Sequence, residues 1–322
     1  MAINVNVLTP TTQPRFGPNL SIKRTSDSTL LIDRLSLPPP ITPRSLSAGI
    51  TTTSGGFRLT FPTTISPTGR RKLTSTVAAA TMLPQNPVVA DICAAALTGG
   101  VALSLLKLWQ VTAKLGFFDQ KLNRKLVHIS VGLAFMLCWP LFSSGHRGAI
   151  LAALVPGINI VKMLILGLGI TKDEATVKSM SRYGDYRELL KGPLYYAAAI
   201  TFACAYYWRT SPIAIAVVCN LCAGDGLADI IGRRFGHQKL PHNKNKSFAG
   251  SITMATAGFI ACIGYMCYFS SFGFVRGSWG MVLGFLVVSL GSALVESLPI
   301  STDLDDNLTV PLASILLGSL VF

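Results

Sequence analysis

Acidic residues are scarce in this chain of 322 residues, which has 14 Asp and Glu against 28 Lys and Arg. Charged residues of both signs make up only 13% of the chain, whereas half of the residues are hydrophobic. So small a charged fraction excludes an ordinary soluble enzyme. The mean hydropathy of +0.50 instead predicts a membrane protein that crosses the bilayer several times.

The chain also lacks the common sequence signatures of nucleotide-binding proteins. It has neither G-x-x-x-x-G-K-[ST] nor an H-R-D and D-F-G pair, which excludes a P-loop enzyme and a protein kinase. The net charge of +14 does not indicate nucleic-acid binding, because half of it lies in the first 72 residues, where nine Lys and Arg accompany two Asp. The other positive charges lie mostly between apolar segments, not on a basic face interleaved with aromatic residues.

The seven cysteines lie almost entirely inside apolar segments, so the sequence predicts no disulfide framework. Cys219 and Cys222 form a C-x-x-C pair, but no second pair or suitably spaced His completes a zinc site. We therefore predict that both are small residues used in helix packing.

Residues 1–76 have the composition of an organelle-targeting presequence. They are rich in Ser, Thr and Pro, carry scattered Arg and Lys, and have almost no acids and no long apolar run. These features predict a disordered transit peptide and exclude a secretory signal. The Met-Ala start and the P-P-P cluster favour a plastid over a mitochondrion, although a disordered cytosolic tail has the same composition. We therefore divide the chain into a plastid transit peptide, 1–76, and a transmembrane domain, 77–322.

From Val88 onward the chain is a series of apolar runs, each near the ~20 residues that a helix needs to cross a bilayer. The pattern predicts an all-α polytopic membrane protein with seven or eight transmembrane helices, of which the second, fourth and last are short. The candidate spans are 88–109, 127–142, 148–170, 193–208, 212–230, 248–269, 279–300 and 308–322.

Eight spans place the connecting loops alternately on two sides of the membrane. One set is 110–126, 171–192, 231–247 and 301–307, and the other is 143–147, 209–211 and 270–278. Most Lys and Arg lie in the first three loops of the first set. The positive-inside rule therefore places that set on the stromal face.

The stretch 219–251 combines carboxylates, glycines and a basic loop at the end of an apolar run. Asp225 and Asp229 are spaced i, i+4, which places both carboxylates on one face of a helix, as a shared Mg²⁺ requires. Ionisable residues in an apolar span are costly and usually face a cavity or a partner. The glycines let a phosphate or another backbone approach closely, and the cations suit a polyphosphate. The phosphate-binding candidates are Gly224, Gly226, Gly232, Arg233, Gly236, Lys239, Lys244, Lys246 and Ser247.

This stretch resembles the signature of the polyprenol kinase family, which includes dolichol kinases and plant phytol and farnesol kinases. The similarity rests on G-D-G-L-A-D-I-I-G-R-R-F-G followed by K-L-P, N-K-N-K-S and G-S, and it extends from about Arg124 to the C-terminus. The K-S-F-A-G-S form is most similar to the plastid phytol kinase branch, and Ala249 stands where many dolichol-type relatives have Glu. The resemblance implies an enzyme that phosphorylates an isoprenoid alcohol from a nucleoside triphosphate, commonly CTP. It also implies a place in tocopherol biosynthesis.

Other polar residues on the same predicted face are further candidates. Arg124 and Lys125 open the second span, either as topological anchors or as phosphate contacts, and His128 either packs or forms a hydrogen bond there. Glu188 and Lys191 are spaced i, i+3, as in an exposed ion pair. The family carries a similar E-L-L-x-G-P element, which implies that Glu188 is a site residue.

Four carboxylates near the end of the seventh span need a cation, because acids there oppose the positive-inside trend. They are Glu296, Asp303, Asp305 and Asp306. They either pair with the basic loop or join the two helix carboxylates in binding magnesium. We predict a catalytic role for at least one of Glu296, Asp303 and Asp306, and we treat Asp305 as a solvated residue.

The sequence therefore predicts phosphoryl transfer at a membrane boundary, where a water-soluble nucleotide meets an oil-soluble alcohol held among membrane lipid. Three alternatives stay open: a kinase for farnesol or geranylgeraniol, a cytidylyltransferase acting on a lipid phosphate, and a membrane transporter whose acids line an ion path. For the tail of the alcohol we predict a narrow apolar groove between the helices around the site, where small residues leave space. Its small residues are Gly258, Ala261, Gly264, Gly284, Gly291, Ser292 and Ala293.

Overall fold

The computed structural model describes residues 86–299 and 304–322. Within these residues the chain is helical apart from turns and one isolated antiparallel bridge between Lys239 and Ser247. The predicted all-α class is confirmed. The predicted transit peptide, 1–76, and the candidate Asp303 lie outside the described residues.

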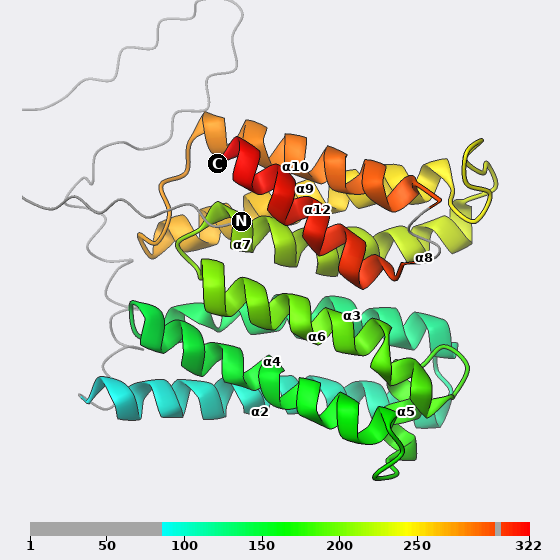
Figure 1. The fold of residues 1–322 in the computed structure, drawn as a ribbon, viewed down its shortest axis with the longest axis horizontal. Helices are drawn as coiled ribbons and strands as arrows, with labels where there is room; N and C mark the ends of the chain where they lie inside the picture. Colours follow the sequence, from blue (N-terminus) through cyan, green and yellow to red (C-terminus); the bar gives the residue numbers. More distant parts are fainter. Residues whose placement is uncertain (1–85, 300–303) are drawn as a thin grey trace, which may run out of the picture. The chain divides into compact units, whose positions relative to one another are not determined.

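Ten α-helices and four short helical segments are described (Figure 1). The α-helices are α2 Pro87–Leu115, α3 Gln120–Leu137, α4 His146–Gly167, α5 Glu174–Met180, α6 Gly192–Phe202, α7 Pro212–Cys219, α8 Gly226–Phe235, α9 Phe248–Ser271, α10 Trp279–Ser297 and α12 Asp306–Val321. The short segments are η2 Trp139–Leu141, η3 Tyr186–Leu190, η4 Ala203–Tyr207 and η5 Asn220–Asp225. The first two are 3₁₀ turns, and the other two are π-helical.

Six helical stretches in the described residues are long and apolar enough to cross a membrane. They are Pro87–Leu115, Gln120–Leu141, His146–Gly167, Pro212–Phe235, Phe248–Ser271 and Trp279–Ser297. The predicted fourth span consists of α6 followed by η4, and the predicted eighth is α12, a shorter apolar helix. Both are shorter than the ~20 residues of a full crossing. The count of seven or eight spans therefore stays a prediction.

The helices begin where the sequence supplies a cap. Side chains of Asp119, Ser247 and Ser278 accept hydrogen bonds from the first-turn backbone N–H groups of α3, α9 and α10. Proline occupies the first turn of α2 and of α7, where its missing N–H costs nothing. These caps satisfy backbone donors that would otherwise be unpaired at the membrane boundary.

The continuous helix α7–η5–α8 is the central element of the fold. Nearly every side chain of α7 and η5 is buried, and α9, α10 and α12 pack around them. Asn220 holds this packing inside the membrane: its Oδ1 accepts from Ser289 Oγ at 2.9 Å and its Nδ2 donates to Ser314 Oγ at 3.3 Å. A Cβ at Gly258 would lie 2.2 Å from Asn220 Oδ1, so only glycine allows α9 this close.

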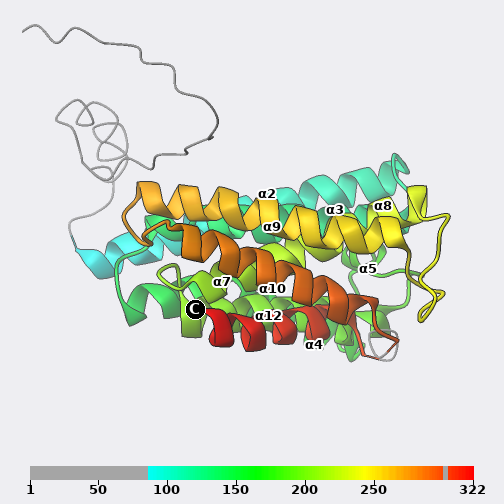
Figure 2. The same cartoon turned by 90° about the horizontal axis from the view of Figure 1, so that it is seen from above.

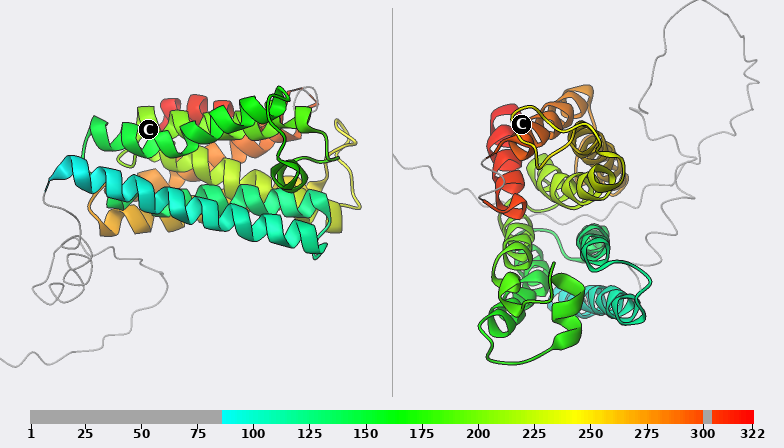
Figure 3. Two further views of the ribbon diagram at one scale, coloured as in Figure 1. Left: turned by 90° about the horizontal axis from the view of Figure 1, so that it is seen from below. Right: turned by 90° about the vertical axis from the view of Figure 1, so that its right-hand side faces the viewer.

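Helices α2, α3, α4 and α6 form a second group that packs on the first through α3 and α6 (Figure 3). At one end of this group Arg209 is buried and donates to the carbonyls of Trp139 and Phe142, at 2.7 and 2.8 Å. Its guanidinium also lies over the ring of Phe274, 3.9 Å from the centroid. This end of the helices is therefore closed by packed aromatic residues.

The loops rich in Lys and Arg lie at the other end of the helices. Figures 1 and 2 place α5 and the loop between α8 and α9 together at this end, while the start of α4 lies at the opposite end. Two loops of the first predicted set thus lie together, opposite one loop of the second set, and the side of the membrane that each set faces stays a prediction.

The loop arrangement predicts a labelling pattern for single cysteines placed at Arg187, Gln238 and Ser144, all exposed. Arg187→Cys and Gln238→Cys should react with an impermeant maleimide from the same side of oriented vesicles, and Ser144→Cys from the other side. The background should lack the exposed Cys93 and Cys267. Labelling of all three positions from one side would show that the helices do not cross the membrane in this order.

Candidate active site

A polar cavity of about 550 Å³ opens at the end of the helices that carries the basic loops. Seven cations and three carboxylates line it, an excess of four positive charges. The cations are Lys121, Arg124, Lys125, Arg182, Lys191, Arg233 and Lys246, and the carboxylates are Asp229, Asp305 and Asp306. Such a surplus of fixed positive charge in a recess favours a polyanion.

Asp225 holds one of these cations in place from behind the cavity. Its Oδ2 accepts from Lys125 Nζ at 2.7 Å and lies 3.4 Å from His128 Nε2, and all three side chains are buried. Lys125 is one hundred residues away in sequence. The pair therefore fixes the start of α3 against the end of η5.

The π-helical segment η5 offers a backbone carbonyl to which α3 hydrogen-bonds. A π turn leaves a backbone carbonyl without its usual helical partner, and here the carbonyl of Leu221 accepts from His128 Nε2 at 2.8 Å. The ring of His128 also packs on that of Tyr196, with centroids 4.2 Å apart. Tyr196 Oη in turn donates to the carbonyl of His128 at 2.6 Å. Helices α3, α6 and η5 are thus tied together just below the cavity.

Lys246 lies between two carboxylates that come from different helices. Its Nζ pairs with Glu296 at the end of α10 and lies 2.9 Å from Asp306 at the start of α12. Burial alone would lower the pKa of Lys246, but Asp306 and Glu296 outweigh it and raise the pKa. The ammonium therefore stays charged at physiological pH.

The loop that carries Lys246 is fixed by its own hydrogen bonds. The backbone N–H of Leu240 donates to the carbonyl of Lys246 at 3.1 Å. Asn243 Nδ2 donates to the carbonyls of Ser297 and Leu298, both at 3.2 Å. The N-K-N-K-S run thus docks on the end of α10, which brings Lys246 to Glu296.

The glycines of the motif make room for neighbouring helices and do not line the polar cavity. A Cβ at Gly224 would lie 3.1 Å from the carbonyl oxygen of Met254, and one at Gly226 would lie 2.3 Å from Ile129 Cγ1. A Cβ at Gly232 would lie 3.2 Å from Ser247 Oγ. The sequence allows either a phosphate or another part of the chain to approach these glycines closely. The structure shows the second of these, the approach of a neighbouring backbone or side chain.

Gly236 offers a test of this packing role. A Cβ there would lie 2.0 Å from the carbonyl oxygen of Gly232 and 2.3 Å from Ser247 Oγ. Gly236→Ala should therefore displace the loop and lower the melting temperature, because the nearest atom belongs to rigid backbone. Gly100→Ala is the control, since its Cβ would meet nothing within 4 Å. Equal melting temperatures for both variants would contradict this role.

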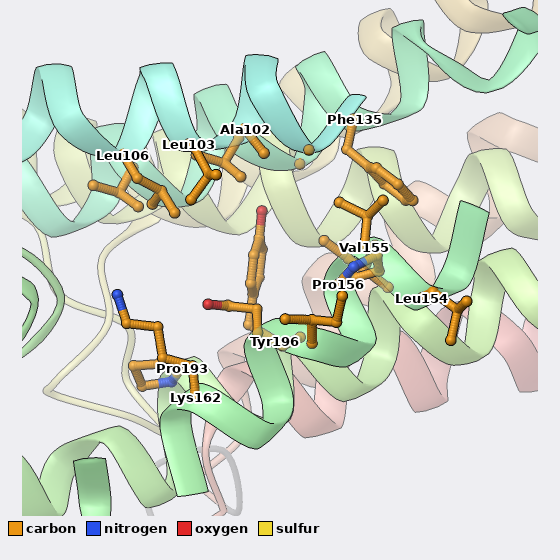
Figure 4. Close-up of a pocket in the computed structure, with 18 of the residues that line it drawn as sticks. Ala102, Leu103, Leu106, Phe135, Leu154, Val155, Pro156, Lys162, Pro193 and Tyr196 are labelled. Carbon is orange, nitrogen blue, oxygen red and sulfur yellow. The ribbon is translucent and has the colours of Figure 1, made fainter. Parts of the chain in front are cut away.

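A second, apolar cavity of about 570 Å³ lies between α2, α3, α4 and α6 (Figure 4). Arg124 lines both this cavity and the polar one. Beside it, a Cβ built on Gly192 would lie within 4 Å of Arg124, Asp305 and Asn307. These polar groups mark the boundary where the two cavities meet.

The small residues predicted to leave the tail groove do not line the apolar cavity, so that part of the prediction is wrong. The space beside Gly284 is taken by Phe322, and that beside Gly291 by Leu317, at 2.4 and 2.3 Å from a Cβ built there. Gly258 faces Asn220 in the same way. Gly258, Gly284 and Gly291 thus allow close packing of their neighbours, whereas Gly264 is exposed with nothing within 4 Å of a Cβ built there. The apolar cavity lies elsewhere, between α2, α3, α4 and α6.

The other predicted residues differ in whether they line the polar cavity. Asp229 and Arg233 pair with each other at i, i+4 and both line the polar cavity. Lys239 and Lys244 are exposed and lie outside it. Glu188 accepts from the backbone N–H of Arg182, and no ion pair with Lys191 forms among the described residues.

Several polar residues of the cavities were not predicted as site residues, among them Lys121, Arg182, Lys191, Asp305 and Asn307. Asp305 is not the solvated residue that the sequence predicts. Its side chain is only 16% exposed, caps α12 through Asn307 and lies 3.9 Å from Arg182. Its position directly before a helix was the signal for a cap, but nothing local indicates the approach of Arg182.

The described carboxylates near the polar cavity are too dispersed to form a metal site by themselves. Among the described residues no group of three or more His, Cys, Asp or Glu could hold a metal ion. Mg²⁺ bound to a nucleotide needs fewer, because it commonly uses one or two carboxylates together with phosphates and water. Asp225, one of the two predicted ligands, is paired with Lys125, whereas Asp229 lines the cavity and accepts from Arg233. Asp229 is therefore the carboxylate that would hold the ion together with the phosphates, in exchange for its bonds to Arg233.

Comparison with known proteins decides the family. The chain is 71% identical over 241 residues to the probable phytol kinase 3, chloroplastic, of Glycine max, covering 75% of this chain and 76% of that protein. It is 66% identical over 251 residues to the farnesol kinase, chloroplastic, of Arabidopsis thaliana, covering 78% and 82%. The chain belongs to the plant phytol and farnesol kinase family. It is also 40% identical over 274 residues to phytol kinase 1, chloroplastic, of Arabidopsis thaliana, covering 84% and 90%.

The relatives and the helices together place the protein in a chloroplast membrane. All three of these relatives carry the word chloroplastic in their names, and six stretches of this chain are long and apolar enough to cross a bilayer. No family model matches the chain. No solved structure matches it either.

Proposed function

We propose that this protein transfers the terminal phosphoryl group of CTP to the hydroxyl of phytol or a related isoprenoid alcohol such as farnesol. The observation that carries the proposal is the meeting of two unlike cavities at Arg124, one cationic and one apolar. A nucleotide and an isoprenoid alcohol need these two environments side by side. If phytol is the acceptor, the product is phytyl phosphate, which feeds tocopherol biosynthesis.

The charges of the polar cavity suit the triphosphate. A loose phosphoryl-transfer transition state needs positioning and neutralisation of charge more than covalent help. In the proposal Lys125, Lys246 and Arg124 contact the phosphates, since all three line the cavity and are held by buried surroundings. Arg124 lies nearest the apolar side and contacts the phosphoryl group as it moves to the alcohol.

The transfer is an in-line displacement. The hydroxyl oxygen of the alcohol forms a bond to the γ-phosphorus of CTP, the bond from this phosphorus to the bridging oxygen breaks, and CDP leaves. The hydroxyl proton passes to a carboxylate. Asp306 suits this step because it lines the cavity, and its Oδ1 is buried with no hydrogen-bond partner in the described part of the chain. Magnesium bound at Asp229 would neutralise phosphate charge.

The proposal is tested with the purified full-length protein in detergent, labelled CTP and a panel of alcohols. We expect CDP and a phosphorylated prenyl alcohol from phytol, geranylgeraniol or farnesol, and no product from glycerol, which lacks burial energy. Release of pyrophosphate would instead show a cytidylyltransferase. Use of dolichol as well as phytol would contradict the phytol and farnesol assignment, and use of no prenyl alcohol would overturn the proposal.

A further inference from the structure

We infer that the apolar cavity holds the isoprenoid tail, that the tail enters it sideways from the bilayer between α2 and α4, and that Gly99 limits which tails fit. The inference rests on the proposed function and concerns the acceptor half of the same site. It assigns the control of tail specificity to Gly99 in α2, whereas the sequence predicted that small residues of the sixth and seventh spans line the tail site.

The cavity has one polar end and one apolar end. Arg124 and Asn307 line it where it meets the polar cavity, and Phe135 lines it eleven residues further along α3. Eleven residues of α-helix span ~16 Å, so the cavity is elongated along the helices. The ring of Phe135 packs edge-on against Trp139, with centroids 6.0 Å apart, and Trp139 stacks on Phe269. The floor is therefore a packed aromatic cluster.

The wall between α2 and α4 is open to the surroundings of the protein. Leu103 of α2 and Leu154 and Ile158 of α4 line the cavity, and yet they are 62%, 51% and 69% exposed. At the depth of these helices the surroundings are lipid chains, not water. An alcohol dissolved in the membrane thus reaches the cavity without leaving the bilayer, and its hydroxyl end comes to rest beside Arg124.

Gly99 lies in α2 midway between two other lining residues, Ile92 and Leu106. A Cβ at Gly99 would meet nothing within 4 Å, so the glycine leaves open space and is not required by packing. A larger side chain at this position would project into the middle of the cavity. It would therefore block a tail that extends past it toward Phe135.

The neighbouring Gly100 provides a matched control. A Cβ there also meets nothing within 4 Å, but Gly100 is exposed and does not line the cavity. Gly99→Leu and Gly100→Leu make the same chemical change in the same helix turn. Any loss of helix flexibility or of insertion efficiency is common to both, whereas filling of the cavity is confined to Gly99→Leu.

The experiment measures kcat and KM for phytol, geranylgeraniol and farnesol, and KM for CTP, in both variants of the full-length protein in lipid nanodiscs. Gly99→Leu should lower kcat/KM for phytol and geranylgeraniol at least ~10-fold, and for the shorter farnesol by less. Gly100→Leu should stay within about twofold of the parent. KM for CTP should not change in either variant.

Direct binding separates failure of this inference from failure of the proposed function. Tritiated phytol should bind the parent and Gly100→Leu and bind Gly99→Leu weakly, with no nucleotide present. If the parent binds phytol in this pattern but transfers no phosphate, the reaction assignment fails and the tail site stands. Equal phytol binding and equal kinetics in the two variants would overturn the inference and would mean that ordinary bilayer lipid fills the cavity.

Discussion

Lys246→Gln is expected to lower kcat at least ~1000-fold, because a cation that neutralises a transferred phosphoryl group contributes a factor of that order. Lys246 is held in the polar cavity by two carboxylates, Glu296 and Asp306. Its removal leaves both carboxylates without their shared cation, which costs ~3–5 kcal/mol when a buried pair is broken. The measurement is single-turnover transfer from labelled CTP at saturating alcohol.

Two control variants separate the effect of the lost Lys246 charge on kcat from its effect on the stability of the fold. Lys244→Gln changes an exposed lysine two residues away that does not line the cavity, and its kcat should match the parent. Lys246→Gln combined with Glu296→Gln removes one uncompensated charge and should recover part of the melting temperature without recovering kcat. If the double variant recovers kcat together with the melting temperature, the role of Lys246 is structural and not catalytic.

The raised pKa of Lys246 fixes the direction of its pH dependence. A lysine whose pKa is higher in the folded than in the unfolded chain stabilises the fold fully below its unfolded pKa of ~10.4. That contribution is lost only as the pH rises through the higher folded value. Burial and the nearby Asp225 raise the pKa of Asp306, which shares Lys246, to about 6, so the pair also weakens as Asp306 becomes protonated. The melting temperature difference between the parent and Lys246→Gln should therefore be largest near pH 8 to 9 and shrink both above that range and as the pH falls toward 6. A difference that grows as the pH rises above 9 would contradict the ion-pair assignment.

Asp225→Asn is expected to lower kcat at least ~100-fold, equivalent to ~2.7 kcal/mol in the transition state. The carboxylate is buried against Lys125 at 2.7 Å, so neutralising it leaves the ammonium without its counter-charge. Lys125 would then no longer be held toward the phosphates. Asp119→Asn, at an exposed cap of α3, should stay within about twofold of the parent.

A magnesium titration distinguishes the two roles open to Asp225. If it positions Lys125, as its contacts favour, Asp225→Asn lowers kcat while the magnesium concentration for half-maximal activity stays unchanged. Asp229→Asn should raise that concentration. A double-mutant cycle of Lys125→Gln with Asp225→Asn should show strong coupling. A higher magnesium requirement in Asp225→Asn, with no coupling to Lys125, would instead make Asp225 a metal ligand.

The sequence by itself determined the class of protein and the end of the helices where its site lies. Apolar runs longer than a soluble helix needs, and the collection of Lys and Arg in alternate loops, are local features that survive any packing of the spans. They predicted the helical membrane class, and the three basic loops, 110–126, 171–192 and 231–247, predicted the cationic face. The motif from Asp225 to Ser247 resembled the right family because its residues are adjacent along the chain.

Only the tertiary structure decided which groups meet. Asp225 was placed with Asp229 on helix spacing, but its contact is Lys125 from α3, and Asp305 meets Arg182 from another loop. The small residues of α9 and α10 suggested a groove, yet Phe322 and Leu317 fill the space beside Gly284 and Gly291 of α10, while the cavity lies beside Gly99 in α2. Periodicity fixes the face of one helix on which a side chain lies. It does not fix which helix packs against that face, since this depends on side-chain packing between segments far apart in sequence.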